Sequence, residues 1–148
     1  MILYLDTSAL VKLYVEEAGS TLVQRSVDAV ELVGTCSIAY VELSAALARR
    51  QREGALTARE RRRLMRAIDE DWPGFLVVEL RDILIKDAGD AARRHALRAY
   101  DAVHLASCLL LRRQLDHDIT FACWDAGLAG AAVKAGLRII PHIRDEGA

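Results

Sequence analysis

The chain begins with a short apolar run that ends at an acidic residue. Residues 2–5 are too few for a helix and include β-branched and aromatic side chains, so they predict a buried strand that ends at Asp6. Thr7 and Ser8 can cap a helix, and apolar residues recur at helical spacing up to Tyr14. Ligands of open α/β sheets bind beyond the carboxyl ends of the strands. Asp6 is therefore a candidate ligand-binding residue, with helix capping as the alternative.

The same alternation of apolar runs and helical spacing continues along the chain. Helical spacing predicts helices over residues 20–31, 39–53, 57–72, 82–94, 97–113 and 126–136. Short apolar runs predict strands over residues 32–38, 76–80, 119–124 and 137–140. This order predicts an α/β domain with a mostly parallel sheet of four to five strands and helices on both faces.

The pattern also predicts which side chains face the core and where elements begin or end. In the helices over residues 39–53 and 82–94, we expect the inward faces to comprise Val41, Leu43, Ala45, Ala46, Leu47, Ile83, Leu84, Ile85 and Ala88. Thr57 and Glu60 have the spacing of a capping box at a helix start. Pro141 closes the last strand, and residues 142–148 are expected to form a frayed tail.

Length and composition indicate one domain over residues 1–148. Apolar residues make up 53% and charged residues 28%, which excludes wholesale disorder. No run approaches the ~18 apolar residues of a membrane-spanning helix, and the N-terminus lacks the basic region of a signal peptide. Cys36, Cys108 and Cys123 lie in apolar segments without a C-x-x-C motif, which predicts buried thiols in a reducing compartment. We therefore expect a cytoplasmic protein that does not associate with membranes.

Positive charge is concentrated in one stretch although the net charge is close to zero. Twenty Lys and Arg face 21 Asp and Glu, so the overall field does not by itself recruit nucleic acid. The densest positive cluster comprises Arg49, Arg50, Arg52, Arg59, Arg61, Arg62, Arg63 and Arg66. Such a cluster usually forms a solvated helix face, and a patch that contacts phosphates or a partner protein is the alternative.

Three further acids are expected at the same edge of the sheet as Asp6. Glu42 lies in the first turn of a predicted helix that follows a strand, and Asp125 directly follows another strand. Asp101 lies near the start of the most apolar helix, where a carboxylate is costly unless it is exposed or paired with a cation. The alternative for Glu42 is a solvated acid that the helix dipole favours.

His104 follows Asp101 by three residues and therefore shares its helix face. An imidazole in this position can ligate a metal ion. We favour the interpretation of a core histidine that is held by hydrogen bonds.

Four carboxylates that meet in one crevice require a cation, because each raises the pKa of its neighbours. A set of oxygen ligands without a His or Cys cluster suits Mg²⁺ or Mn²⁺. Such a centre supports hydrolysis of a phosphodiester, because the metal activates water and stabilises the leaving oxygen. Thr7 and Ser8 are candidates for contacts with a metal-bound water or a phosphate oxygen.

Four segments of the chain carry these acids: LDTSALVKLY, SIAYVELSAAL, RAYDAVHLA and TFACWDAGL. In their order and spacing they resemble the PIN domain, and within it the VapC-type toxins of bacterial toxin-antitoxin pairs. The resemblance covers nearly the whole chain and implies a PIN-like three-layer fold. It also implies a Mg²⁺- or Mn²⁺-dependent endoribonuclease that acts on RNA, forms a homodimer and is inhibited by a cognate antitoxin.

The resemblance assigns roles to the four acids. Asp6 and Asp101 match the core metal ligands of the family, and the other two acids match those that complete the catalytic site. The polar pair after Asp6 also matches the family. Cys123 and Trp124 depart from the small polar residues that precede the fourth acid in the family, which affects the expected local contacts with water or substrate.

Other classes of protein fit the sequence less well. A haloacid-dehalogenase-like phosphatase needs a second acid two residues after the first, where this chain has Ser8. A dinucleotide-binding domain needs a G-x-G-x-x-G motif after the first strand, and LDTSAL contains no glycine. The remaining alternative is a PIN-like module that binds RNA or a protein without cutting, and the presence of all four acids argues against it. Asp116 and Asp118 precede their strand, so we place them at its opposite end.

Overall fold

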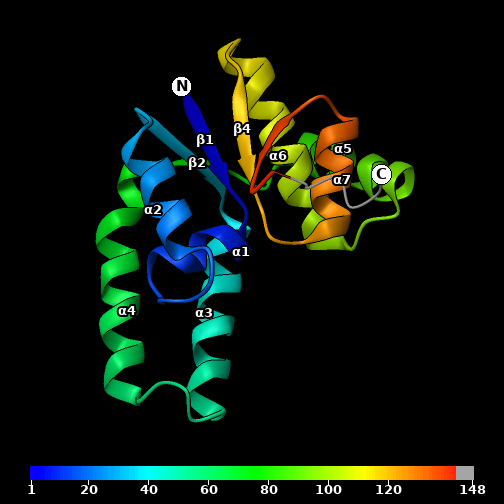
Figure 1. Ribbon diagram of the computed structural model, residues 1–148. Helices are drawn as coiled ribbons and strands as arrows, with labels where there is room; N and C mark the ends of the chain where they lie inside the picture. Colours follow the sequence, from blue (N-terminus) through cyan, green and yellow to red (C-terminus); the bar gives the residue numbers. More distant parts are fainter. Residues whose placement is uncertain (143–148) are drawn as a thin grey trace, which may run out of the picture.

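The computed structural model describes residues 1–142, and within them five strands form one parallel sheet (Figure 1). The strands are β1 (Ile2–Leu5), β2 (Leu32–Cys36), β3 (Leu76–Val78), β4 (Ile119–Ala122) and β5 (Arg138–Ile140). Their spatial order is β3-β2-β1-β4-β5, and every neighbouring pair is parallel. The predicted α/β fold is therefore confirmed. From residue 143 onward, the expected tail lies outside the described residues.

Helices cover both faces of this sheet. They are α1 (Thr7–Leu10), α2 (Ser20–Asp28), α3 (Ile38–Arg52), α4 (Ala58–Asp71), α5 (Asp82–His95), α6 (Ala99–Leu115) and α7 (Ala126–Lys134), with 3₁₀ turns η1 (Val11–Leu13) and η2 (Trp72–Gly74). The segment that was predicted as one helix up to Tyr14 is thus divided into α1 and η1. Within residues 1–142, no helix combines the length and apolar character needed to cross a membrane.

The central strand β1 supplies side chains to two separate cores. Ile2 and Tyr4 pack in a cluster with residues of α5, α6 and α7, whereas Leu3 and Leu5 pack with residues of α1, α3 and α4. Figure 1 shows these two sets of helices on opposite sides of the sheet. Because successive side chains of a strand point to opposite faces, a shift of one residue would exchange the two sets. Burial on both faces therefore fixes the register of β1, and with it the position of Asp6 at the end of the strand.

Several apolar side chains that were predicted to face the core are exposed. Val41 is 61% exposed, and Ile83 and Ile85 are 61% and 49% exposed. The buried positions of α3 include Leu43 and Leu47, which are four residues apart and so share one helix face. Val41 lies outside this stripe. In α5 the same geometry leaves Leu84 facing inward, while its neighbours at positions 83 and 85 face outward. Consecutive residues of a helix cannot all face one core.

The arginine cluster lies on the α3–α4 hairpin, which extends away from the sheet in Figure 1. The predicted capping box between Thr57 and Glu60 is present at the start of α4. Arg50 donates to Glu17 over 2.8 Å, so this member of the cluster stabilises the fold. The exposed members that form no salt bridge within residues 1–142 are Arg52, Arg59, Arg62, Arg63 and Arg66.

The three cysteines are buried free thiols, as the sequence predicted. Burial raises the pKa of Cys108 well above its usual range and raises that of Cys123 to about 12. Since the thiolate is the reactive form, these two side chains act as apolar packing groups.

Trp124 connects the end of β4 to the turn before α2. Its ring lies against Gly19, the N-cap residue of α2, which has a left-handed φ of 93°. A Cβ atom on Gly19 would lie 2.7 Å from the ring atom Cζ2. The Nζ atom of Lys12 lies 4.8 Å from the ring centroid, within the range of a cation–π contact. Gly19 thus provides both an unusual backbone conformation and space for the ring.

We expect Gly19→Ala to lower the free energy of unfolding by about 2–4 kcal/mol, because left-handed strain of about 1 kcal/mol adds to overpacking of about 1–3 kcal/mol. Gly54→Ala is the matched control, since Gly54 has a φ of 80° and no heavy atom lies within 4 Å of its added Cβ. The control should lose only about 1 kcal/mol. Urea unfolding followed by tryptophan fluorescence measures both losses. Equal losses would contradict the contact between Gly19 and the Trp124 ring.

Candidate active site

The four acids predicted to share one crevice lie at the edge of the sheet where the parallel strands end. Asp6 follows β1, and Asp125 follows the adjacent strand β4 and forms the N-cap of α7. Asp101 lies in the first turn of α6. Glu42 lies just beyond the first turn of α3, because this helix starts at Ile38, one residue earlier than predicted.

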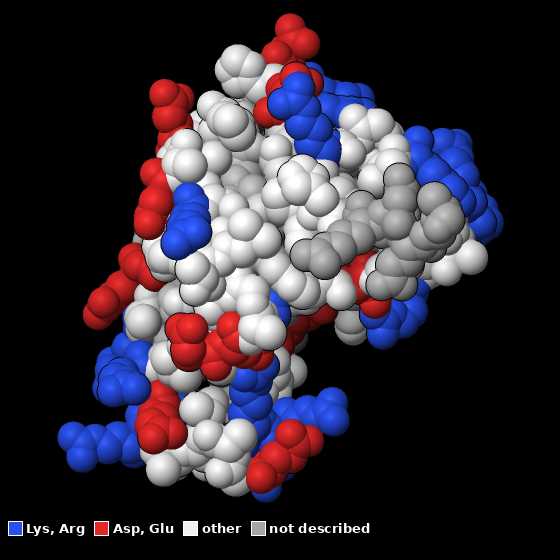
Figure 2. Space-filling model, viewed as in Figure 1, with Lys and Arg blue, Asp and Glu red and all other residues white. Residues whose placement is uncertain are grey.

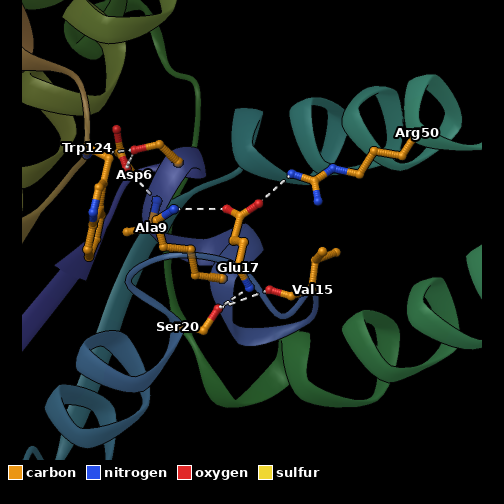
Figure 3. A network of polar contacts seen from close by, with 9 residues as sticks. Asp6, Ala9, Val15, Glu17, Ser20, Arg50 and Trp124 are labelled. Atoms are coloured by element: carbon orange, nitrogen blue, oxygen red, sulfur yellow. Dashed lines mark hydrogen bonds and ion pairs between the residues drawn. The ribbon is translucent and has the colours of Figure 1, made fainter. Parts of the chain in front are cut away.

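Asp6 is 4% exposed and has one oxygen fixed by its own segment. Its Oδ1 atom accepts hydrogen bonds from the Ser8 hydroxyl at 2.7 Å and from the Ala9 backbone N–H at 2.9 Å. Figure 3 shows Asp6 next to Ala9 and Trp124 at the start of α1. Within residues 1–142, its Oδ2 atom accepts no hydrogen bond. Asp6 therefore caps α1 with one oxygen and leaves the other available to a ligand.

The carboxyl of Asp6 holds its proton more strongly than an ordinary aspartate. Burial raises its pKa to about 6, although nearby His104 and the bonds from Ser8 and Ala9 oppose this shift. The negative charge of Asp101 raises the pKa further, which indicates that the two carboxyls interact electrostatically. The site thus favours the binding of a positive charge or a proton near Asp6.

Glu42 is held by two donors, one from α1 and one from α6. Its Oε1 atom accepts the Thr7 hydroxyl at 2.7 Å and lies 2.8 Å from Nε2 of His104. Burial opposes the charge of Glu42, but the bonds from His104 and Thr7 outweigh it and lower the pKa below the usual range. Glu42 is therefore a held carboxylate, and the alternative of a freely solvated acid is wrong.

His104 is 2% exposed and lies between the core and Glu42. Its Nδ1 atom lies 2.9 Å from the hydroxyl of Tyr4, and its Nε2 atom lies 3.1 Å from the Thr7 oxygen as well as near Glu42. Since Thr7 donates its only hydroxyl hydrogen to Glu42, Nε2 is the protonated nitrogen and Nδ1 accepts from Tyr4. The favoured interpretation of His104 as a hydrogen-bonded core residue is confirmed.

Asp101 and Asp125 are joined by one arginine. Nε of Arg98 lies 3.0 Å from Oδ2 of Asp101, and Nη2 lies 3.0 Å from Oδ2 of Asp125. Oδ1 of Asp125 accepts the backbone N–H of Leu128 at 2.9 Å and caps α7. Asp101 is thus paired with a cation, as its position at the start of an apolar helix requires.

The polar residues next to the acids are engaged within the protein. The Ser8 hydroxyl donates to Asp6 and accepts the backbone N–H of Trp124 at 2.9 Å. The Thr7 hydroxyl bonds to Glu42. Both side chains orient acids of the site, and their contacts with water or phosphate remain a prediction. Trp124, which departs from the family pattern, contacts this region through its backbone while its ring packs on Gly19.

The oxygens of the site fit a hard divalent cation in their chemistry. Asp6, Glu42 and Asp125 each have one oxygen fixed by neutral donors of the protein, and the second oxygen is either without a hydrogen bond within residues 1–142 or held only by Arg98. Ligands oriented in this way bind metals more tightly. In the described part of the chain, no three His, Cys, Asp or Glu side chains are close enough together to hold an ion.

The sequence did not single out Tyr4 or Arg98. The spacing of Arg98 and Asp101 is visible in the chain, and the need of Asp101 for a cation is the signal that indicates this pair. The bond of Arg98 to Asp125 spans 27 residues and could not be recognised from local spacing. Tyr4 looked like an ordinary core residue of a strand.

Comparison with known proteins shows the family of the chain. Residues 3–119 match the PIN domain family. Ribonuclease VapC49 of Mycobacterium tuberculosis is 39% identical to the chain over 140 residues, which are 95% of each protein. The crystal structure of VapC20 of Mycobacterium tuberculosis, a sarcin-ricin loop cleaving toxin, has a TM-score of 0.65 and 19% identity and covers 87% of this chain and 94% of that one. A toxin-antitoxin complex from Klebsiella pneumoniae has a TM-score of 0.63 and 14% identity, with 86% and 90% covered.

The matched residues include three of the four acids, and the relative at 39% identity covers 95% of the chain. The structural neighbours share the fold of this chain over most of their length. The resemblance inferred from the four acidic segments is thus confirmed. The chain belongs to the PIN-domain family, and within it to the VapC ribonucleases.

Proposed function

We propose that this protein is the toxin of a toxin-antitoxin pair and hydrolyses phosphodiester bonds of RNA with the help of Mg²⁺ or Mn²⁺. Its catalytic and metal-binding residues are Asp6, Glu42, Asp101 and Asp125. One observation carries the proposal: acids from four distant segments lie at one edge of the sheet. Thr7, which follows Asp6, and His104, on the same helix as Asp101, both hold Glu42, and Arg98 joins Asp101 to Asp125.

The protein's own residues prepare this site for a cation. Ser8 and Ala9 orient Asp6, and Thr7 and His104 orient Glu42, so these carboxylates lose little freedom when they bind a ligand. A bound divalent cation supplies an activated water and stabilises the leaving oxygen of the phosphodiester. The lowered pKa of Glu42 keeps its carboxylate charged, and the raised pKa of Asp6 makes that carboxyl the one that a proton occupies first.

The proposed partners are RNA, a cognate antitoxin and a second copy of the chain. The neighbour from Klebsiella pneumoniae is itself a toxin-antitoxin complex, which supports an antitoxin partner. An RNA substrate of such a site would be recognised by its shape and its unpaired loops. The domain assignment of residues 1–148 to a single PIN domain belongs to the same proposal and is supported by the single sheet of the described residues.

A PIN module that binds RNA or a protein without cutting is the second candidate. The observation in its favour is that, within residues 1–142, the acids are not gathered around one point and two of them hold Arg98. The two candidates differ in one outcome. A ribonuclease cuts RNA when Mn²⁺ or Mg²⁺ is present, whereas a binding module retains RNA intact with either metal.

We expect the purified protein to cut some members of a panel of structured RNAs in Mn²⁺, and Asp6→Asn or Asp101→Asn to lower the rate about a hundredfold or more. Loss of an outer-shell partner alone typically costs about 10–100-fold in metal affinity or activity. Asp118→Asn is the control, since Asp118 is 89% exposed and lies before β4, at the opposite end of that strand. Its rate should stay within about twofold of the wild type. Binding of RNA without cleavage by the wild type would support the binding module instead.

The stability of the metal-free protein should depend on pH through Asp6. Between the ordinary pKa of 3.8 and the raised value of about 6, the native protein binds more protons at Asp6 than the unfolded chain does. The free energy of unfolding therefore falls as pH rises through this window, by up to about 3 kcal/mol, and levels off above it. Asp6→Asn lacks this dependence. Urea unfolding in EDTA measures the free energy of unfolding of both proteins. From about pH 4 to pH 7, the value for Asp6→Asn should rise relative to that of the wild type.

A constant difference across this range would contradict the buried, charge-disfavouring position of Asp6. The comparison requires EDTA because a bound cation would stabilise the charged form of Asp6 and mask the effect.

A further inference from the structure

Arg98 has an unusual position for an exposed side chain. Its side chain is 77% exposed, yet two of its nitrogens contact two acids of the proposed site, Asp101 and Asp125. One acid comes from α6 and the other from the loop after β4. A single flexible cation therefore connects two separate segments at the site.

These contacts are not a consequence of helix capping. Arg98 is the N-cap residue of α6 and makes no capping hydrogen bond with its side chain. A positive charge at this end of a helix opposes the helix dipole. Within residues 1–142, the guanidinium forms its hydrogen bonds with the two acids. The side chain of Arg98 thus pairs with the acids and does not stabilise the start of the helix.

The chemistry of the guanidinium suits a second partner. Its planar fork of donors matches a carboxylate and a phosphate equally well. The guanidinium is the exposed member of both ion pairs, whereas Asp101 is 18% and Asp125 38% exposed, so water can replace Arg98 on its side of each pair. Arg98 can therefore leave the carboxylates without disturbing the core and reach a phosphate at the same edge of the sheet.

We propose that Arg98 is a movable counter-ion of the active site. In the metal-free protein it neutralises Asp101 and Asp125, and when these carboxylates turn to a divalent cation, Arg98 releases them and binds a phosphate of the RNA. The proposal rests on the ribonuclease function proposed above. It makes Arg98 a residue that competes with the metal before the reaction and contacts the substrate during it.

The two roles predict effects of opposite sign when the charge is removed. Arg98→Ala removes a competing cation, so Mn²⁺ should bind about three- to tenfold more tightly, as expected for loss of one unit charge at a distance of several ångströms in a partly solvated site. Cleavage of RNA at saturating Mn²⁺ should nevertheless fall, with kcat/KM about 10–100-fold lower, because a phosphate contact is lost. A side chain that only holds two segments together would lower both quantities.

The experiment compares Arg98→Ala and Arg98→Lys with Arg81→Ala. Arg81 is the matched control, because it is the N-cap residue of α5, is 75% exposed and pairs with Glu79 over 2.8 Å. Mn²⁺ affinity is measured by isothermal titration calorimetry and by the fluorescence of Trp124, which adjoins Asp125. Arg98→Lys keeps the charge and should bind Mn²⁺ as the wild type does, with partial loss of kcat/KM. Arg81→Ala should leave both quantities unchanged.

Two results would overturn the proposal: Mn²⁺ affinity in Arg98→Ala that is unchanged or weaker, or cleavage at saturating Mn²⁺ that equals that of the wild type. In either case, the wild type still binds Mn²⁺ and cuts RNA, and the proposed function stands. If the wild type neither binds Mn²⁺ nor cuts RNA, the proposed function fails and the role of Arg98 fails with it.

Discussion

The arrangement of the site depends on the burial of one imidazole. His104 is 2% exposed, and each of its ring nitrogens has a partner, the Tyr4 hydroxyl on one side and Glu42 on the other. A buried polar atom that loses its partner typically costs about 1–3 kcal/mol. Since these partners belong to β1 and α3 while the ring belongs to α6, the hydrogen bonds of His104 fix three elements relative to one another. Because the acids of the site lie on or next to these elements, the hydrogen bonds of His104 also help to position the acids.

The strand β1 connects this constraint to the hydrophobic core. Tyr4 faces the core formed with α5, α6 and α7, where its ring stacks on Phe121 with centroids 5.4 Å apart. Its hydroxyl is the only polar part of the side chain, and it points to His104. Leu5 packs on the other face of the sheet, and Asp6 follows directly. The packing of two consecutive core residues thus determines where the first acid leaves the sheet.

A second polar network, centred on Glu17, stabilises the elements next to α1. Glu17 accepts Lys12 over 2.9 Å and Arg50 over 2.8 Å, and these bonds outweigh its burial and lower its pKa (Figure 3). The ion pairs connect η1 with α3, on the same face of the sheet as α1. Figure 2 shows acidic and basic side chains close together along this part of the molecule. Arg50, a member of the densest positive cluster in the sequence, therefore stabilises the fold.

Local patterns predicted the strands, the helices and the positions of the four acids well. Asp6 and Asp125 could be found because an acid that directly follows a buried strand is recognisable from a few neighbouring residues. The partners of His104 could not be predicted from the sequence, because Tyr4 and Glu42 are 100 and 62 residues away in the chain. The inward faces of α3 and α5 were too wide in the prediction, since apolar composition alone does not show which side of a helix meets the sheet.

The four acids are held in two different ways, and this difference determines where the site can change. Asp6 and Glu42 are bound by donors from α1 and from the buried His104, and a rearrangement there would leave buried groups without partners. Asp101 and Asp125 are each paired through Oδ2 with the exposed guanidinium of Arg98, which water can replace as a partner, and Oδ1 of Asp125 also caps α7. The pairing of Asp101 and Asp125 with Arg98 can therefore be broken at lower cost than the buried hydrogen bonds of Asp6 and Glu42. A cation bound as we propose would therefore displace Arg98 from Asp101 and Asp125 more easily than it would break the hydrogen bonds of Asp6 and Glu42.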